Sequence, residues 1–427
     1  MNVFVFPACN EPGLEAIRAL GKSNKIDLFG GSSYNLDFDP ARHLLQNYVP
    51  CPGIHEPGFE EAFKEVLRKH GIAVVFPTMD VFVAMFSRWQ VPGVTFVTPR
   101  VEIAELLLSK RATYERLGPT VPVPRLYDAE TAPLPVFAKP DQAGGSRGSM
   151  AVRTRDELRV AAQRDLLLCE HLPGDEYTVD CVSDRQGRLL FAGVRERGRI
   201  GRGISLGTRA VDEPRIAAHV AAIADILRIE GIWFAQFKRN AQGDPVLLEV
   251  NARVAGSMTL TRLMGVNIPL MAFFLYTGQD VRVPRPRSGV LLNRSLANHA
   301  AMAPFDSVVW DWDDTIIRRD GKPDPKAMAC LYDLHNRAVR QFLVTKNPDV
   351  ETAMEQHQIP RFFVDVRTSE NKVDELGRLL ADHGLQVQRC VVVNDSYVET
   401  FAIQERYPGI RNVTPDALDV LGCEAAC

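Results

Sequence analysis

Short apolar runs alternate with amphipathic stretches over residues 1–100. The apolar runs predict strands at 2–6, 25–31 and 72–78, and the stretches between them predict helices at 13–23 and 59–71. This strand–helix order predicts a parallel sheet with helices on both faces. The loop after the first strand lacks the G-x-G-x-x-G fingerprint, so we expect a Rossmann-like shape without dinucleotide chemistry.

The pattern changes near residue 100 and again near residue 295. Between these points a proline-rich connector leads into mixed hairpins and helices, which predicts an α+β region. From Phe305 onward, strands and helices alternate once more. We therefore expect an α/β domain at 1–100, an α+β domain at 101–295, a linker at 296–304 and an α/β domain with a parallel sheet at 305–427.

Composition excludes several classes of partner. The chain has 427 residues and a net charge of −3, so it has no basic surplus for a nucleic-acid backbone. No apolar run approaches the ~20 residues that cross a bilayer, and the start of the chain lacks an export signal. The eight cysteines lie mostly inside apolar runs, which favours reduced thiols. We expect a cytoplasmic protein that binds neither nucleic acid nor membrane, with homo-oligomerisation left open.

The first strand of the middle region ends in a lysine and is followed by a glycine-rich turn. Lys139 closes this strand, and Gly144, Gly145 and Ser146 come next. An ammonium group beside bare main-chain N–H groups suits a polyphosphate. The alternative is a surface lysine beside an ordinary hairpin turn.

An extended link with two acids follows between apolar strands. Glu170 and Leu172 lie in this link, and their main-chain groups are suited to the edge of an adenine. Glu176, a few residues further on, is suited to a ribose diol. The alternative is a salt-bridged pair of strands.

The apolar segment 245–253 carries three polar side chains at alternating positions. Glu249, Asn251 and Arg253 would therefore point to one face of a strand, and Gln236 would lie on the neighbouring strand. Oxygen atoms from Gln236, Glu249 and Asn251 are hard ligands suited to Mg²⁺, and Arg253 supplies a planar cation. An exposed polar face is the weaker alternative, because the strand is otherwise apolar.

In order and spacing, these residues resemble the ATP-grasp superfamily, in its carbamoyl-phosphate synthase-like and biotin carboxylase-like branch. The resemblance spans roughly residues 1–285 and implies ATP as substrate, with Mg²⁺ or Mn²⁺. It makes Lys110 and Lys139 the nucleotide lysines and Arg253 the residue that stabilises the phosphoryl or acyl-phosphate group. Most members activate a carboxylate as an acyl phosphate, which an amine attacks, and a few are kinases. The basic segment 195–211 is either an acceptor loop or a solvated hairpin.

Polar residues also stand at the predicted strand ends of 305–427. Asp311 and Asp313 follow one apolar strand, Thr345 ends a second, Lys372 begins a helix and Asp395 follows a third strand. The carboxyl ends of parallel strands meet at one edge of a sheet, which is the usual place for a site. Two carboxylates this close repel each other unless a cation lies between them.

This set resembles the haloacid dehalogenase (HAD)-type phosphatase superfamily over residues 305–425. The resemblance makes Asp311 the nucleophile, Asp313 the general acid and base, and Thr345 and Lys372 the partners of the phosphoryl oxygens. Mg²⁺ would be held by Asp311, Asp395 and the main-chain carbonyl of Asp313.

One departure is Asn394, which stands where a glycine is common before the last acid. The short intervals between motifs indicate a capless member. Together the two resemblances predict a bifunctional enzyme, a carboxylate–amine ligase joined to a phosphatase that acts on a phosphoester. The alternatives are an ATP-grasp kinase paired with a phosphatase, or a nucleotide-binding scaffold with one silent domain.

Overall fold

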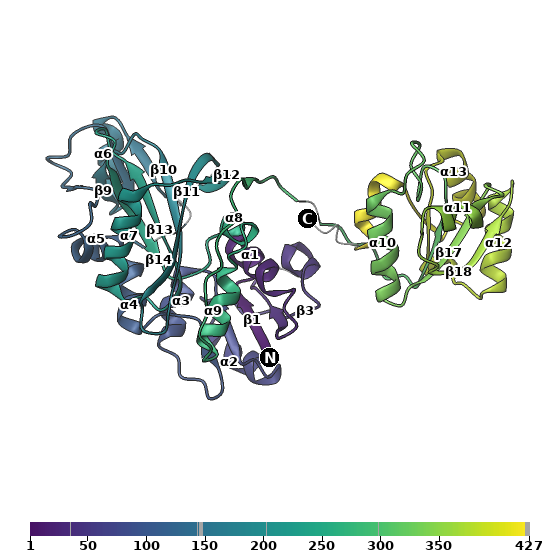
Figure 1. Ribbon diagram of the computed structural model, residues 1–427, viewed down its shortest axis with the longest axis horizontal. Helices are drawn as coiled ribbons and strands as arrows, with labels where there is room; N and C mark the ends of the chain where they lie inside the picture. Colours follow the sequence, from purple (N-terminus) through teal and green to yellow (C-terminus); the bar gives the residue numbers. More distant parts are fainter. Residues whose placement is uncertain (35, 143, 145–147, 202, 298, 423–427) are drawn as a thin grey trace. The chain divides into compact units, whose positions relative to one another are not determined.

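The computed structural model describes residues 1–34, 36–142, 144, 148–201, 203–297 and 299–422. The chain divides into two compact units, Met1–Ser295 and Leu296–Cys427. Figure 1 labels the helices and strands of each unit. Within the described residues, no helix is both long and apolar enough to cross a bilayer.

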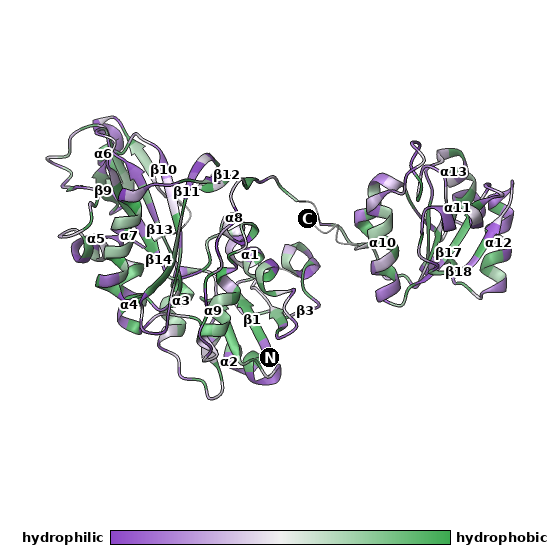
Figure 2. Cartoon of the chain, in the orientation of Figure 1, coloured by the Kyte–Doolittle hydropathy of each residue, from purple (hydrophilic) through white to green (hydrophobic). Residues whose placement is uncertain are grey.

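The N-terminal part of the first unit is a five-stranded parallel sheet in the order β3-β2-β1-β4-β5. On one face, Val3 and Val5 pack against helix α1 and helix α9 (Ile268–Tyr276). On the other, Phe4 and Phe6 pack against α2 and α3. The central strand is therefore buried on both sides and hydrophobic after its first residue, Asn2 (Figure 2). The bounds are β1 Asn2–Phe6, α1 Glu11–Leu20, β2 Asp27–Gly30, β3 Asn47–Tyr48, α2 Phe59–Lys69, β4 Val74–Pro77, α3 Asp80–Ser87 and β5 Thr95–Phe96.

Two antiparallel sheets complete the first unit. The larger has the order β14-β13-β10-β11-β12-β15 and packs one face on helix α7, and the smaller has the order β6-β9-β7-β8 and packs on α6. The strands are β6 Leu126–Tyr127, β7 Val136–Lys139, β8 Met150–Val152, β9 Leu167–Glu170, β10 Glu176–Ser183, β11 Leu189–Gly201, β12 Ile204–Ala210, β13 Gly231–Arg239, β14 Pro245–Asn251 and β15 Leu291–Asn293. The helices are α4 Val101–Leu108, α5 Lys110–Leu117, α6 Arg155–Gln163, α7 Pro214–Leu227, α8 Thr259–Leu263 and α9 Ile268–Tyr276.

The second unit is built on a five-stranded parallel sheet in the order β18-β17-β16-β19-β20. Val308 and Trp310 of β16 face helix α10, and Val309 faces α12, so this central strand is also buried on both sides. The bounds are β16 Ser307–Trp310, α10 Pro325–Asn336, β17 Arg340–Thr345, α11 Val350–Gln356, β18 Phe363–Thr368, α12 Lys372–Asp382, β19 Cys390–Val393, α13 Tyr397–Arg406 and β20 Arg411–Val413.

Candidate active site

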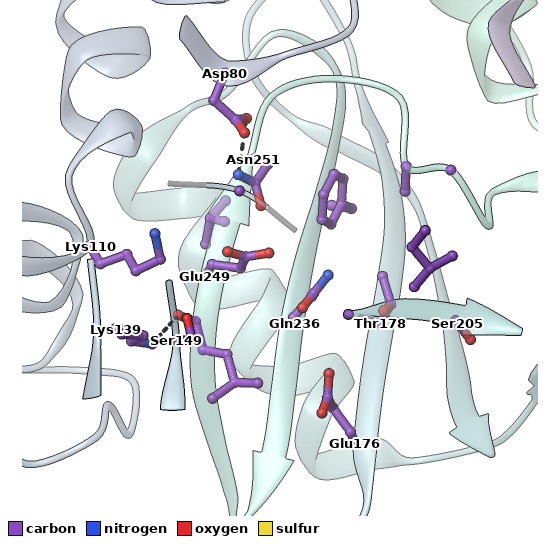
Figure 3. Close-up of a pocket in the computed structure, with 18 of the residues that line it drawn as sticks. Asp80, Lys110, Lys139, Ser149, Glu176, Thr178, Ser205, Gln236, Glu249 and Asn251 are labelled. Atoms are coloured by element: carbon purple, nitrogen blue, oxygen red, sulfur yellow. Dashed lines mark hydrogen bonds between the residues drawn. The ribbon is translucent and has the colours of Figure 1, made fainter. Parts of the chain in front are cut away.

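A cavity of about 1340 Å³ lies in the first unit. Its walls come from both antiparallel sheets and from the loops that follow β1 and β4 of the parallel sheet. Figure 3 shows that side chains of several elements converge on it. The cavity therefore joins the parallel sheet at 1–100 to the antiparallel sheets of 101–295 in one site.

Two lysines lie on the same side of the cavity (Figure 3). Lys139, at the end of β7, is buried, and its Nζ donates to the Tyr114 hydroxyl (2.5 Å) and to the Leu248 carbonyl (3.3 Å). Burial lowers the pKa of Lys139. Lys110, the first residue of α5, donates from Nζ to the main-chain carbonyl of Asp141 (3.1 Å). The two cations belong to separate elements and both line the cavity.

The glycine-rich turn is described only in part. Gly144 lines the cavity, whereas Gly145 and Ser146 lie outside the described residues. A Cβ atom added to Gly144 would lie 3.4 Å from Oδ2 of Asp80. Gly144 therefore lies close to the Asp80 and Arg253 side chains.

The three residues predicted to bind adenosine also line the cavity. Glu170 ends β9, and its main-chain N–H donates to the Arg125 carbonyl (2.8 Å), so an adenine contact there must use the Glu170 carbonyl. Leu172 is buried. Glu176 begins β10 and forms ion pairs with Arg197 and with Lys238, the latter at 3.8 Å.

Arg197 contacts two of the predicted site residues, and nothing in the sequence indicated these contacts. Its Nη1 contacts the Glu176 carboxylate and donates to Oε1 of Gln236 (3.2 Å), and its Nη2 donates to the Gly203 carbonyl (2.6 Å). A predicted ribose acid and a predicted metal ligand thus share one guanidinium. Both residues keep further acceptor capacity, because a carboxylate has about four lone-pair sites and an amide oxygen has about two.

The predicted magnesium ligands lie together on β13 and β14. Gln236 pairs directly with Glu249 across the two strands, and Figure 3 shows their side chains beside Asn251. Nδ2 of Asn251 donates to Asp80 (3.0 Å), whereas its buried Oδ1 has no hydrogen-bond partner within the described part of the chain. One carboxylate and two amide oxygens suit a hard divalent cation between phosphates, so the residues fit Mg²⁺.

Arg253 lies beyond the strand on which the sequence analysis placed it, because β14 ends at Asn251. Its Nε and Nη2 donate to the two carboxylate oxygens of Asp80, both at 2.9 Å, and its Nη1 donates to the Val254 carbonyl (3.1 Å). Burial opposes the charged form of Asp80, but Arg253 outweighs it and the pKa of Asp80 is lowered. Asp80 was missed because FPTMD at 76–80 carries no motif that marks it.

In the second unit, Asp311 and Lys372 form a buried ion pair. Nζ of Lys372 lies 2.7 Å from Oδ1 of Asp311 and 3.0 Å from Oε2 of Glu399. Burial raises the pKa of Asp311 to about 6, although Lys372 opposes the shift. Burial, with Asp314 and Asp395 nearby, also raises the pKa of Asp313, against the effect of Lys372. Lys372, which is distant from Asp311 in the sequence, supplies a positive charge next to it. The closeness of the Asp311 and Asp313 carboxylates is therefore not by itself evidence of a metal ion.

The remaining predicted residues lie at the carboxyl ends of neighbouring strands. Thr345 ends β17, where its Oγ1 accepts from the Asn347 N–H (3.0 Å), and Asp395 follows β19. Within the described residues, no three His, Cys, Asp or Glu side chains are grouped to hold a metal. The Mg²⁺ site that the resemblance implies, with the Asp313 main-chain carbonyl as its third ligand, remains a prediction.

Asn394, the departure noted in the sequence, shapes the turn before Asp395. Its Oδ1 accepts from the Ser396 N–H (2.7 Å), and its Nδ2 donates to Oε2 of Glu399 (2.9 Å). This side chain therefore does what a glycine cannot do, because it fixes Glu399 next to Lys372.

Comparison with known proteins identifies the fold of the first unit. Residues 162–295 match the model of a family described as ATP-grasp in the biosynthetic pathway with Ter operon. Among curated proteins, no sequence matches this chain.

Solved structures of biotin carboxylases are similar to the first unit. One is the biotin carboxylase domain of 2-oxoglutarate carboxylase from Hydrogenobacter thermophilus, solved with MgADP, ADP and bicarbonate (18% identity, 68% of this chain, 73% of that chain, TM-score 0.57). Another is biotin carboxylase from Campylobacter jejuni in complex with β,γ-ATP (17%, 66%, 71%, 0.54). A third is pyruvate carboxylase from Rhizobium etli (19%, 66%, 28%, 0.53).

Residues 162–295 therefore match an ATP-grasp family model, and the first unit has a mixed α/β fold similar to that of biotin carboxylases, in agreement with the resemblance noted in the sequence. These comparisons give no evidence for the phosphatase resemblance of the second unit. The phosphatase assignment remains a prediction.

Proposed function

We propose that Met1–Ser295 is an ATP-dependent, ADP-forming ligase that joins a carboxylate to an amine through an acyl phosphate. The observation that carries this proposal is the arrangement of Gln236, Glu249 and Asn251 beside Lys110 and Lys139 in one cavity. The oxygen atoms are suited to Mg²⁺ and the two lysines to the nucleotide phosphates. Arg253 is a planar cation next to Asn251 and stabilises the negative charge that develops on the transferred phosphoryl group.

The test is ATP turnover by the full chain with paired carboxylate and amine substrates. We expect ADP release that requires both Mg²⁺ and an added carboxylate, with mass spectrometry revealing a coupled product. Turnover that ends in a phosphorylated hydroxyl compound would instead identify a kinase. Nucleotide binding without any turnover across the panel would favour the scaffold alternative.

We propose further that Leu296–Cys427 is a Mg²⁺-dependent phosphatase of the HAD type. The supporting observation is the buried Asp311–Lys372 pair at the carboxyl edge of a parallel sheet. In this mechanism a carboxylate oxygen of Asp311 attacks phosphorus, and the ester P–O bond breaks. Asp313 protonates the leaving oxygen and then takes a proton from the water that releases phosphate. Lys372 and Thr345 balance the charge on the phosphoryl oxygens.

A sequential order would explain why both activities share one chain. The ligase would couple a phosphorylated building block, and the phosphatase would then remove the phosphate ester. Residues 296–304, the predicted linker, are few, so the two sites would share a high effective concentration. Asp311→Asn in the full chain should then accumulate a coupled product that retains its phosphate. A phosphate-free product from this variant would show that the phosphatase acts on another substrate.

A further inference from the structure

The cavity has room for more than a nucleotide. Its volume of about 1340 Å³ exceeds the ~300–1,000 Å³ of an ordinary ligand site. Figure 3 shows Lys110 and Lys139 on one side and Ser205 on the other, with Gln236 and Glu249 between them. The Ser205 side is therefore separate from the two lysines assigned to the nucleotide phosphates.

Glu11 and Arg294 form an ion pair on this second side. Both residues line the cavity although 283 positions separate them, and Nη1 of Arg294 contacts the Ser205 carbonyl (3.5 Å). The side chains of Glu11 and Arg294 are 39% and 16% exposed, so a ligand in the cavity can reach the pair.

The pair also lies close to the proposed reaction centre. Gly256 follows Arg253 in the loop after β14, and a Cβ atom added to Gly256 would lie 2.8 Å from Cβ of Glu11. Only glycine allows this approach, which presses the first turn of α1 against the loop that carries Arg253. A molecule bound at Glu11 would therefore lie near the group that Arg253 stabilises.

A second guanidinium lines the same cavity with an unused donor. Arg195 is buried and binds both oxygens of Asp180 at 2.9 Å, and its buried Nη1 has no hydrogen-bond partner among the described residues. The cavity thus combines an acid with more than one arginine away from the nucleotide lysines. An anion alone would be repelled by Glu11, and an amine alone by Arg294.

We propose that the Glu11–Arg294 pair binds the acceptor of the reaction, and that this acceptor is a free α-amino acid. The carboxylate of the amino acid pairs with Arg294, and its ammonium group pairs with Glu11. Glu11 and Arg294 then each replace their mutual ion pair with an ion pair to the amino acid. Neither charge is left unpaired in this partly buried site. This inference rests on the proposed ligase and specifies its amine.

Thermal unfolding of the full chain tests the site with and without MgADP. The probes are the proteinogenic amino acids and, for each, the corresponding amine without the carboxylate and the acid without the amine. We expect at least one amino acid to raise the unfolding temperature while its two single-charge analogues do not. Glu11→Gln and Arg294→Gln should each weaken that amino acid's binding by about tenfold or more, with MgADP binding unchanged.

Arg209→Gln is the matched control, because it breaks an exposed pair with Glu196 on the same sheet and does not line the cavity. The inference is overturned if no amino acid stabilises the wild-type chain, or if both cavity variants bind amino acid as the wild type does. Failure of MgADP to bind would count against the ligase itself. The amino-acid titration without nucleotide would still show whether the Glu11–Arg294 pair binds an amino acid.

Discussion

Asp80 and Arg253 lie 173 positions apart and form a two-bond ion pair, with both N–O distances at 2.9 Å. Asp80 begins α3 beside the parallel sheet, whereas Arg253 follows the edge strand of the large antiparallel sheet. Asp80 also accepts a hydrogen bond from Asn251. The parallel sheet, which carries no phosphate-binding fingerprint, thus positions two side chains of the proposed ATP site.

Asp80→Asn should lower kcat for carboxylate-dependent ADP release by about tenfold to a hundredfold, with little change in the KM for ATP. The neutral amide cannot hold the Arg253 guanidinium at both donors, and small displacements of a reacting group reduce rate steeply. Asp80→Glu should recover part of the rate, since it restores the charge. Glu105→Gln, which breaks an exposed pair with Arg88, is the control. An unchanged kcat would show that Asp80 only stabilises the fold.

Glu249→Gln should abolish Mg²⁺-dependent ATP turnover while the fold remains intact, because it removes the one carboxylate among the three proposed ligands. Arg253→Lys should lower turnover by about a hundredfold, since an ammonium cannot replace a planar guanidinium. Steady-state ADP release and circular dichroism measure the two effects. Wild-type turnover in both variants would refute the ATP site.

The fragment 305–427 should fold alone and hydrolyse an aryl phosphate with Mg²⁺. The buried residues of both apolar clusters all lie within 308–421, and cutting at residue 305 removes only Met302, which packs at the margin of one cluster. The same fragment with Asp311→Asn should be folded and inactive. This control shows that the hydrolysis comes from the fragment and not from a contaminating phosphatase. An insoluble fragment, or activity that survives the substitution, would contradict the assignment.

The C-terminal unit should lose part of its stability as the pH falls from 4.5 toward 2. Burial opposes the charge on Glu399, but hydrogen bonds from Lys346, Asn394 and Lys372 outweigh it and lower its pKa from 4.5 to about 2. A lowered folded-state pKa stabilises the fold above the unfolded value, and this contribution disappears as the pH falls through the folded value.

Chemical denaturation of the full chain and of Glu399→Gln across this pH range measures the effect. The difference in free energy of unfolding should be largest above pH 4.5 and should shrink toward pH 2. Glu351→Gln, on an exposed part of α11, is the control. A difference that does not depend on pH would mean that Glu399 acts only through packing.

The succession of apolar runs and amphipathic stretches was enough to predict the parallel sheet at residues 1–100. Val3, Phe4, Val5 and Phe6 are all apolar, which is typical of a strand covered on both faces, and the structure places helices on both sides. The same local rule predicted that Glu249 and Asn251 share a face, because side chains two positions apart on a strand point the same way. These properties depend on a few neighbouring residues and can be read from the sequence.

Only the tertiary structure decided which charges meet. Nothing local to Asp80 indicates Arg253, nothing local to Glu11 indicates Arg294, and Arg197 could be assigned to Glu176 and Gln236 only once β10, β11 and β13 were in register. A hydrogen bond forms only when its donor and acceptor atoms lie about 3 Å apart. A shift of one residue in strand pairing turns a side chain to the other face of the sheet and so breaks such a contact. Sequence periodicity fixes the face of each strand, whereas the packing of sheets and helices fixes the partners.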